Sequence, residues 1–242
     1  MKELDELFDI WEKRHRDAGH KRFIRDGIVD ENWWFEKQSV PKICFFLKEA
    51  RTKEEKYNLT NDLREKEPWR LWQRVAVWTQ AIQMAFSGER AYDEEKIKLK
   101  SHDAVKQIAV VNVKKSDGMP ESKGDDLWKY VNDDKDLLKK ELEIINPDII
   151  VCGYTLELLE AVLDAKGNEK NSNPDIRFEK IRDTMYGFWK DKLVIDYYHP
   201  ACHYPNRVNY YALMSICRMA EQEWEERKFE YARKADSNIR TE

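Results

Sequence analysis

Closely spaced cysteines are missing from this sequence. The 242-residue chain has four cysteines, at positions 44, 152, 202 and 217, and no C-x-x-C motif. A cysteine-held zinc ion, an iron–sulfur cluster or a disulfide framework is therefore not expected. Cys44 and Cys152 lie within apolar runs and Cys217 lies on the apolar stripe of a helical segment, which predicts buried, reduced thiols. We expect a protein that needs no metal and no other cofactor.

Long apolar runs and linker-like stretches are also lacking. Seven prolines and eight glycines are too few for a low-complexity chain. No stretch supplies the roughly 20 apolar residues that a membrane-spanning helix needs, and the acidic, amphipathic start does not have the pattern of a secretion signal. We predict a single domain over residues 1–242, cytoplasmic and without a membrane partner.

A surplus of basic residues is absent too. The 43 lysines and arginines are outnumbered by 47 aspartates and glutamates, so the formal net charge is −4. Proteins that bind nucleic acid by bulk electrostatic attraction usually carry a basic surplus. Any contact with nucleic acid must therefore come from a local basic patch. The nine tryptophans fit either a hydrophobic core or platforms on which bases stack.

Four short apolar runs alternate with segments of helical periodicity. Their length and continuous apolar character predict buried strands, at Ile43–Leu47, Ile108–Val113, Asp148–Cys152 and Leu193–Tyr197. Strands that alternate with helices form parallel sheets with helices on both faces. We therefore predict a three-layer α/β/α fold with a central four-stranded parallel sheet. Its core would run from about residue 41 to residue 217, with helical extensions at both ends.

Polar residues follow each of the four predicted strands. They are Lys48-Glu49-Ala50-Arg51, Asn112-Val113-Lys114-Lys115, Gly153-Tyr154-Thr155 and His199-Pro200-Ala201. Each set has an ordinary structural interpretation, as a solvated ion pair, an amide that satisfies the backbone, or a turn. In parallel sheets, however, ligands bind at the edge where the strands end. Polar groups at four successive strand ends therefore favour a common binding site.

The order of these motifs resembles the uracil-DNA glycosylase superfamily, closest in style to its bacterial and archaeal iron–sulfur branch. The family's Gly-Glu-Ala-Pro-Gly motif is similar to residues 48–51, and its Pro-Phe pair to residues 68–69. Its Thr-Asn-Val-Val-Lys strand resembles residues 111–115, and its Pro-x-Val-Ile-Val-x-Leu-Gly segment resembles residues 147–153. Its terminal His-Pro-Ala or His-Pro-Ser motif matches residues 199–201.

The resemblance implies a uracil-DNA glycosylase-like fold and an enzyme that hydrolyses the N-glycosidic bond of uracil or another altered base flipped out of DNA. Asn112 would read the polar edge of the base and Trp69 would stack on its face. His199 would stabilise the negative charge on the departing base. Glu49 is the third catalytic candidate.

Further residues would hold the base and the DNA. The resemblance places Lys48, Ala50 and Arg51 around the base, next to Glu49. The candidates for contact with the nucleic-acid backbone are Lys114, Lys115, Lys123 and Arg207.

Two departures from the family pattern leave other functions open. Lys48 and Arg51 stand where the family has glycine and proline, and the paired cluster cysteines are absent. The alternatives are a non-catalytic protein that binds a nucleobase, a nucleotide or modified nucleic acid, and an interaction protein that retains only the fold. A basic groove beside His199 would favour the glycosylase, and an acidic rim would favour the binding protein. A pocket filled by the chain's own side chains would favour the interaction protein.

Overall fold

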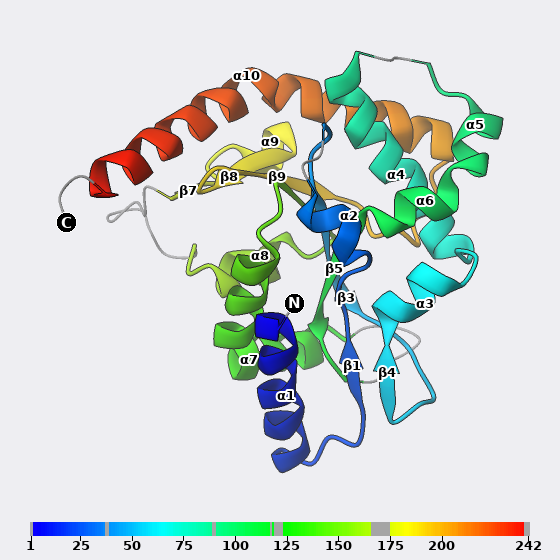
Figure 1. The fold of residues 1–242 in the computed structure, drawn as a ribbon, viewed down its shortest axis with the longest axis vertical. Coiled ribbons are helices and arrows are strands. Elements are labelled where there is room, and N and C mark those ends of the chain that lie inside the picture. The colour runs from blue at the N-terminus through cyan, green and yellow to red at the C-terminus, as the bar shows by residue number, and fades with distance from the viewer. Residues whose placement is uncertain are drawn as a thin grey trace.

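The four apolar runs form the centre of the sheet in the computed structural model, which describes residues 2–36, 39–88, 91–116, 118, 123–165 and 175–239 (Figure 1). The strands are β3 (Ile43–Glu49), β5 (Ile108–Lys114), β6 (Ile149–Gly153) and β9 (Lys192–Tyr197). They lie in the order β5-β3-β6-β9, and each neighbouring pair is parallel. The positions of the predicted strands and their parallel direction are therefore confirmed.

The sheet is larger than predicted, because short antiparallel strands extend it at both edges. β2 (Gly27–Ile28) pairs with β5, while β8 (Tyr186–Trp189) and then β7 (Ile176–Arg177) continue the sheet beyond β9. The described sheet thus has seven strands of mixed direction, and the prediction of four parallel strands is wrong at its edges. These segments have two to four residues, too few for an apolar period to show. A separate two-stranded parallel sheet joins β1 (Phe23–Arg25) to β4 (Lys56–Asn58).

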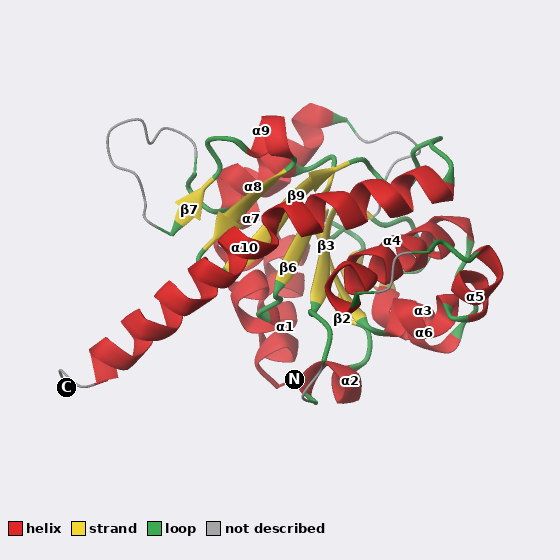
Figure 2. Cartoon of the chain, turned by 90° about the horizontal axis from the view of Figure 1, so that it is seen from above, coloured by secondary structure: helices red, strands yellow, loops and turns green. Residues whose placement is uncertain are grey.

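Helices cover both faces of the sheet, as Figure 2 shows from above. Within the described ranges they are α1 (Lys2–Asp17), α2 (Glu31–Phe35), α3 (Leu59–Glu65), α4 (Arg70–Ser87), α5 (Glu94–Leu99), α6 (Ser101–Lys106), α7 (Gly124–Ile145), α8 (Leu156–Val162), α9 (Ile181–Thr184) and α10 (Asn206–Ile239). Helix α4 begins two residues after Pro68, in line with the preference of proline for helix starts. None of these described helices is long and apolar enough to cross a membrane.

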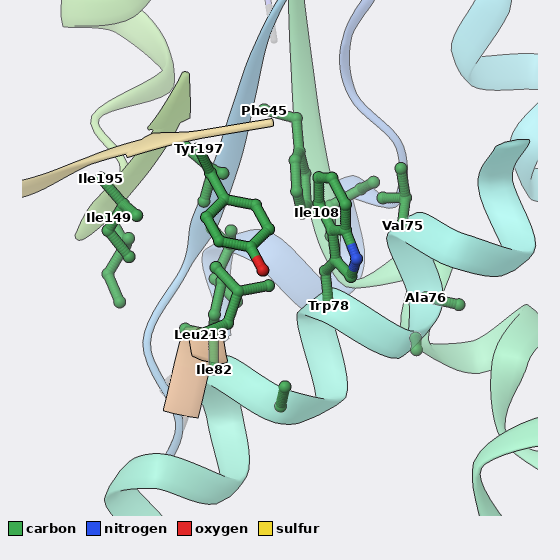
Figure 3. Close-up of a cluster of buried hydrophobic side chains, with 14 of the residues drawn as sticks. Phe45, Val75, Ala76, Trp78, Ile82, Ile108, Ile149, Ile195, Tyr197 and Leu213 are labelled. Atoms are coloured by element: carbon green, nitrogen blue, oxygen red, sulfur yellow. The ribbon is translucent and has the colours of Figure 1, made fainter. Parts of the chain in front are cut away.

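The central strands send alternate side chains into two hydrophobic cores. On one face, Phe45 and Ile195 pack in a core with α4 and α10, where the Trp78 and Tyr197 rings meet edge to face with their centroids 5.0 Å apart (Figure 3). On the other face, the intervening side chains pack in a core with α1, α7 and α8; they include Phe46, Val111, Ile150 and Val194. The sheet is therefore the middle of three layers.

The cysteines are free thiols in or near these cores. Cys44, Cys152 and Cys217 are buried, and Cys202 is partly buried. Burial raises the pKa of Cys44 and of Cys152 well above the ordinary thiol value. These thiols act as small hydrophobic side chains, as predicted.

Candidate functional site

A pocket of about 320 Å³ opens at the carboxyl ends of the parallel strands. Lys48 of β3, Asp196 of β9, and Tyr154 and Thr155 after β6 line one side of it. The first turns of α7 and α8 and one residue of α9 complete the wall; they contribute Gly124, Leu127, Trp128, Leu156, Glu157, Leu158 and Arg182. This is the edge of an open parallel sheet at which ligands bind. We call it the strand-end pocket.

The turn after β6 gives the strand-end pocket its shape. Gly153 has no room for a side chain, because a Cβ there would lie 2.5 Å from Leu47 Cδ2 and 3.3 Å from Pro200 Cδ. Tyr154 then adopts a left-handed conformation with φ +61°, and its backbone N–H donates to the Tyr197 carbonyl at 2.8 Å. The missing side chain thus lets the segment around Pro200 pack directly against the end of β6.

His199 lies in this segment. It is not one of the described residues that line the strand-end pocket, and it is related to that pocket through nearby Lys48. Its Nδ1 accepts a hydrogen bond from the Ala201 backbone N–H at 3.1 Å. The neutral ring therefore carries its proton on Nε2. Burial, with the positive charge of nearby Lys48, lowers the pKa of His199 to about 4. At neutral pH, His199 is an uncharged hydrogen-bond donor.

Lys48 links His199 to the strand-end pocket. Its ammonium group lies over the Tyr154 ring, 5.0 Å from the centroid, in the geometry of a cation–π contact. It lines the pocket while its charge acts on His199. The arrangement sets a positive charge and a neutral donor beside one cavity, a combination that stabilises a developing anion.

Acidic residues share the strand-end pocket with these basic ones. Asp196 lines it, and burial raises the pKa of this carboxyl group despite the opposing charge of Arg182. Glu157 lies on the same wall. Asp196 is not among the site residues predicted from the sequence, because it belongs to the fourth strand itself. The signal was present, since Asp196 is the polar residue in an otherwise apolar run.

Asn112 is placed elsewhere, in the interior at the end of β5. Its side-chain Nδ2 and its backbone N–H both donate to Asp26 Oδ2, at 2.9 Å and 2.7 Å. Only 2% of Asn112 is exposed. The described residues that line the strand-end pocket do not include Asn112. The structure therefore does not bring Asn112 and His199 together across this cavity.

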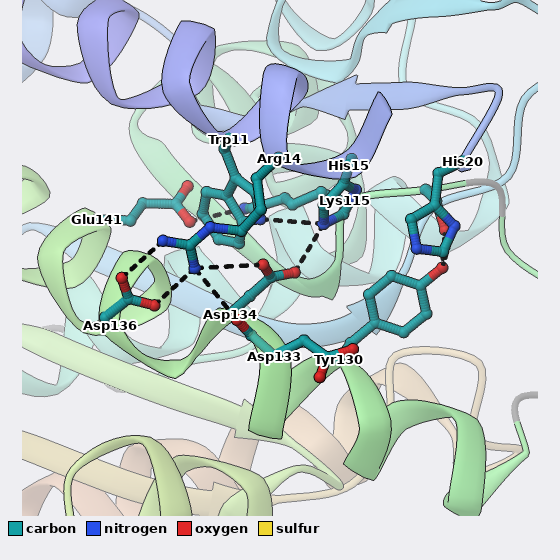
Figure 4. A network of polar contacts seen from close by, with 11 residues as sticks. Trp11, Arg14, His15, His20, Lys115, Tyr130, Asp133, Asp134, Asp136 and Glu141 are labelled. Atoms are coloured by element: carbon teal, nitrogen blue, oxygen red, sulfur yellow. Dashed lines mark hydrogen bonds and ion pairs between the residues drawn. The ribbon is translucent and has the colours of Figure 1, made fainter. Parts of the chain in front are cut away.

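Lys115 also lies in the interior rather than on a surface that nucleic acid could reach. It is fully buried, and its ammonium group binds Asp26. The same group lies 2.7 Å from a carboxylate oxygen of Glu141 (Figure 4). Its Nζ lies 4.9 Å from the centroid of the Trp11 ring. Burial raises the pKa of Glu141 well above its usual value, although the charge of Lys115 opposes the shift. The structure makes Lys115 part of an internal charge cluster.

Glu49 and Ala50 are covered by neighbouring segments. The side chain of Glu49 is only 5% exposed, and one of its oxygens lies 3.4 Å from Lys114 Nζ. Lys114 also binds Asp126, at 2.7 Å. The Ala50 carbonyl accepts a hydrogen bond from the Gly118 N–H at 2.9 Å. Their side chains and backbone are thus engaged within the protein.

The remaining candidates lie on the surface. Trp69 precedes α4 with 44% of its area exposed, and the edge of its ring meets Trp72 with the centroids 6.0 Å apart. Arg51, Lys123 and Arg207 are exposed. Helix α4 contacts the segment after His199 through Arg74, which donates to the Pro200 carbonyl at 2.8 Å. The described lining of the strand-end pocket includes none of these residues.

Comparison with known proteins adds no relative. No family model, no curated protein and no solved structure matches the chain. The described residues include no group of three or more histidine, cysteine, aspartate or glutamate side chains placed to hold a metal ion. Fold and site together define an α/β protein with a strand-end pocket. This pocket is the feature of the structure that bears on function.

Proposed function

We propose that this chain is a DNA glycosylase-like enzyme on a uracil-DNA glycosylase-like fold, acting on uracil or another altered base. The observation that carries the proposal is the state of His199. It is a neutral imidazole with its proton on Nε2, near Lys48, whose side chain lines the strand-end pocket. The order of the motifs along the chain and the parallel order of the four central strands support the same proposal.

The proposed reaction is the hydrolysis of the bond between a base nitrogen and the sugar C1′. As this bond breaks, its electron pair leaves with the base, and the oxygen of a water molecule forms the new bond to C1′. His199 Nε2–H would donate to the departing base, and Lys48 would lower the energy of its negative charge. The proton of the water would pass to a carboxylate. Asp196 is suited to this role, because it lines the pocket and its raised pKa makes it a better base.

A second function is favoured by the partners of two other candidates. Asn112 is bound to Asp26 and Glu49 is paired with Lys114. A pocket without a free amide to read the base and without a free Glu49 suits a protein that binds a nucleobase or nucleotide without cleaving it. In that case the aromatic rings of Tyr154 and Trp128 would provide the stacking surfaces.

Base release under single-turnover conditions separates these functions. The substrates are single-stranded oligonucleotides that carry uracil or other altered bases, and the product is an abasic site. We expect His199→Ala to slow release by about 10²–10³-fold, the usual cost of one donor to a developing anion. His203→Ala is the matched control, because His203 is exposed and lies only four residues away.

Two results would reject the glycosylase. Equal rates for wild type and His199→Ala would remove His199 from the reaction. Absence of base release from any substrate, together with nucleotide binding that Tyr154→Ala weakens, would establish the binding protein instead. Thermal melting of each variant would show that it is folded.

A further inference from the structure

A second hollow lies at the carboxyl end of β5, apart from the strand-end pocket. It consists of two adjoining cavities, of about 570 and 430 Å³, which share His20, Lys21, Arg22 and Glu55. Its walls come from the end of α1, the segment that leads into β1, the start of β4, the end of β5 and α7. We call it the basic cleft. None of its described lining residues belongs to the strand-end pocket.

The basic cleft concentrates positive charge in a chain whose formal net charge is −4. Its lining has two glutamates and five lysines and arginines, which are Arg16, Lys21, Arg22, Lys56 and Lys114. One of the glutamates, Glu12, is bound to both Arg16 and Lys56, at 3.1 Å in each case. Lys21 is exposed and has no hydrogen-bond or ion-pair partner among the described residues. Lys114 is paired with Glu49 and Asp126, which lie outside this lining, so the attraction of an anion rests chiefly on Lys21.

Buried polar side chains form part of the lining of the basic cleft. Lys114, Ser116 and Tyr130 are each at most 6% exposed. The Tyr130 hydroxyl lies 2.5 Å from Ser116 Oγ and 3.2 Å from Nδ1 of His20 (Figure 4). Burial, together with nearby His15, lowers the pKa of His20. Ammonium and hydroxyl groups in such a place are hydrogen-bond donors for an oxyanion.

The backbone holds these groups in position. Gly19 closes α1 with φ +86°, a conformation that favours glycine, and His20 follows it with its N–H donating to the His15 carbonyl at 3.0 Å. The Phe23 N–H donates to the Glu55 carbonyl at 3.1 Å, which joins the two sides of the cleft. The walls are thus tied together before any ligand arrives, and little ordering is needed on binding.

We propose that the basic cleft binds phosphate groups. Lysine and arginine side chains at a rim, with serine and tyrosine hydroxyls beneath, are the groups that contact phosphate oxygens in proteins. Phosphate of this kind belongs either to a nucleic-acid strand or to a small phosphorylated molecule. The proposal does not depend on base release, because the two sites share no described lining residue.

The test measures how a short fluorescent single-stranded oligonucleotide binds at several salt concentrations. Lys21→Glu should lower the slope of log Kd against log salt by about 0.7, the value for one lost phosphate contact on a single strand. Tyr130→Phe should weaken binding by about two- to tenfold, the effect of one hydrogen bond. Lys98→Glu, at an exposed lysine of α5, makes the same charge change far from the cleft. Competition with inorganic phosphate, adenosine monophosphate and adenosine identifies the source of the phosphate.

Each outcome decides the proposal. If Lys21→Glu weakens oligonucleotide binding and Lys98→Glu does not, the proposal is supported. Strong competition by adenosine monophosphate or inorganic phosphate would then indicate a small phosphorylated ligand. Weak competition would indicate a nucleic-acid strand. If Lys21→Glu binds every probe like wild type, or if Lys98→Glu weakens binding equally, the cleft is not a phosphate site. Phosphate binding in a protein that releases no base would reject only the proposed glycosylase.

Discussion

The strand ends of β9 and β5 both carry residues that the motif order marks as functional, but their surroundings differ. After β9, His199 is partly buried near Lys48, which lines a pocket of about 320 Å³. At the end of β5, Asn112 and Lys115 are buried and both are bound to Asp26. The residue types at the two strand ends are similarly polar. They differ in whether a ligand can reach them, because Asn112 and Lys115 are buried and already bound within the protein.

The difference arises from the segment that precedes β3. This segment adds β2 to the edge of the sheet beside β5, and it supplies Asp26, whose two carboxylate oxygens bind the polar groups there. No described segment closes the end of β9 in this way, and the cavity there remains open. A polar residue at a strand end can therefore serve a ligand or the fold, depending on what the rest of the chain packs against it.

The largest effect is expected from removing the carboxylate that binds Asn112 and Lys115. Asp26→Ala would leave the buried ammonium group of Lys115 with one carboxylate fewer and Asn112 without its acceptor. We expect the free energy of unfolding to fall by about 3–5 kcal/mol, as for other broken buried ion pairs. Urea unfolding measures it. Asp9→Ala removes an exposed partner of Arg25 and should cost no more than about 1 kcal/mol; equal losses would show that Asp26 is not a special position.

A smaller loss of stability is expected at the other strand end. Gly153→Ala would place a Cβ 2.5 Å from Leu47 Cδ2, so the segment that carries His199 must shift. Overpacking of this kind costs about 1–3 kcal/mol, and we expect weaker ligand binding in the strand-end pocket as well. Thermal melting and ligand titration measure the two effects. Gly124→Ala is the control for stability alone, because a Cβ there meets nothing within 4 Å although Gly124 lines the pocket. A Gly153→Ala protein as stable as this control would contradict the packing argument.

The smallest effect concerns the protonation of His199. Lys48→Met removes the nearby positive charge but leaves the burial, which is the larger cause of the low pKa. We expect the pKa of His199 to rise from about 4 without reaching 6.5. In an NMR titration, His199 of the wild type should stay neutral as pH falls through 6.5, the ordinary value for histidine. Lys53→Met, at an exposed position, should leave the pKa of His199 unchanged; a wild-type His199 that takes up its proton near pH 6.5 would remove the basis for a neutral donor.

The sequence predicted the centre of the fold better than the site. Continuous apolar runs such as Ile108–Val113 reveal buried strands by themselves, since both faces of a central parallel strand are covered. Two-residue strands such as β2 have no such pattern. The partner of Asn112 lies 86 residues away, and no local period connects the two. The burial of Lys115 could not be predicted from the sequence either, because a lysine after a strand is expected to be exposed unless its carboxylate partners are known.

The buried contacts of Asp26 also constrain when the protein can finish folding during its synthesis. The partners of this aspartate, Asn112 and Lys115, lie 86 and 89 residues further along the chain, and Glu141, which also binds Lys115, comes later still. Until residue 112 has been synthesised, neither of these partners of Asp26 exists. The N-terminal segment therefore completes its docking only after α7 has emerged. Contacts of such long sequence separation form slowly, because the intervening chain must first be ordered.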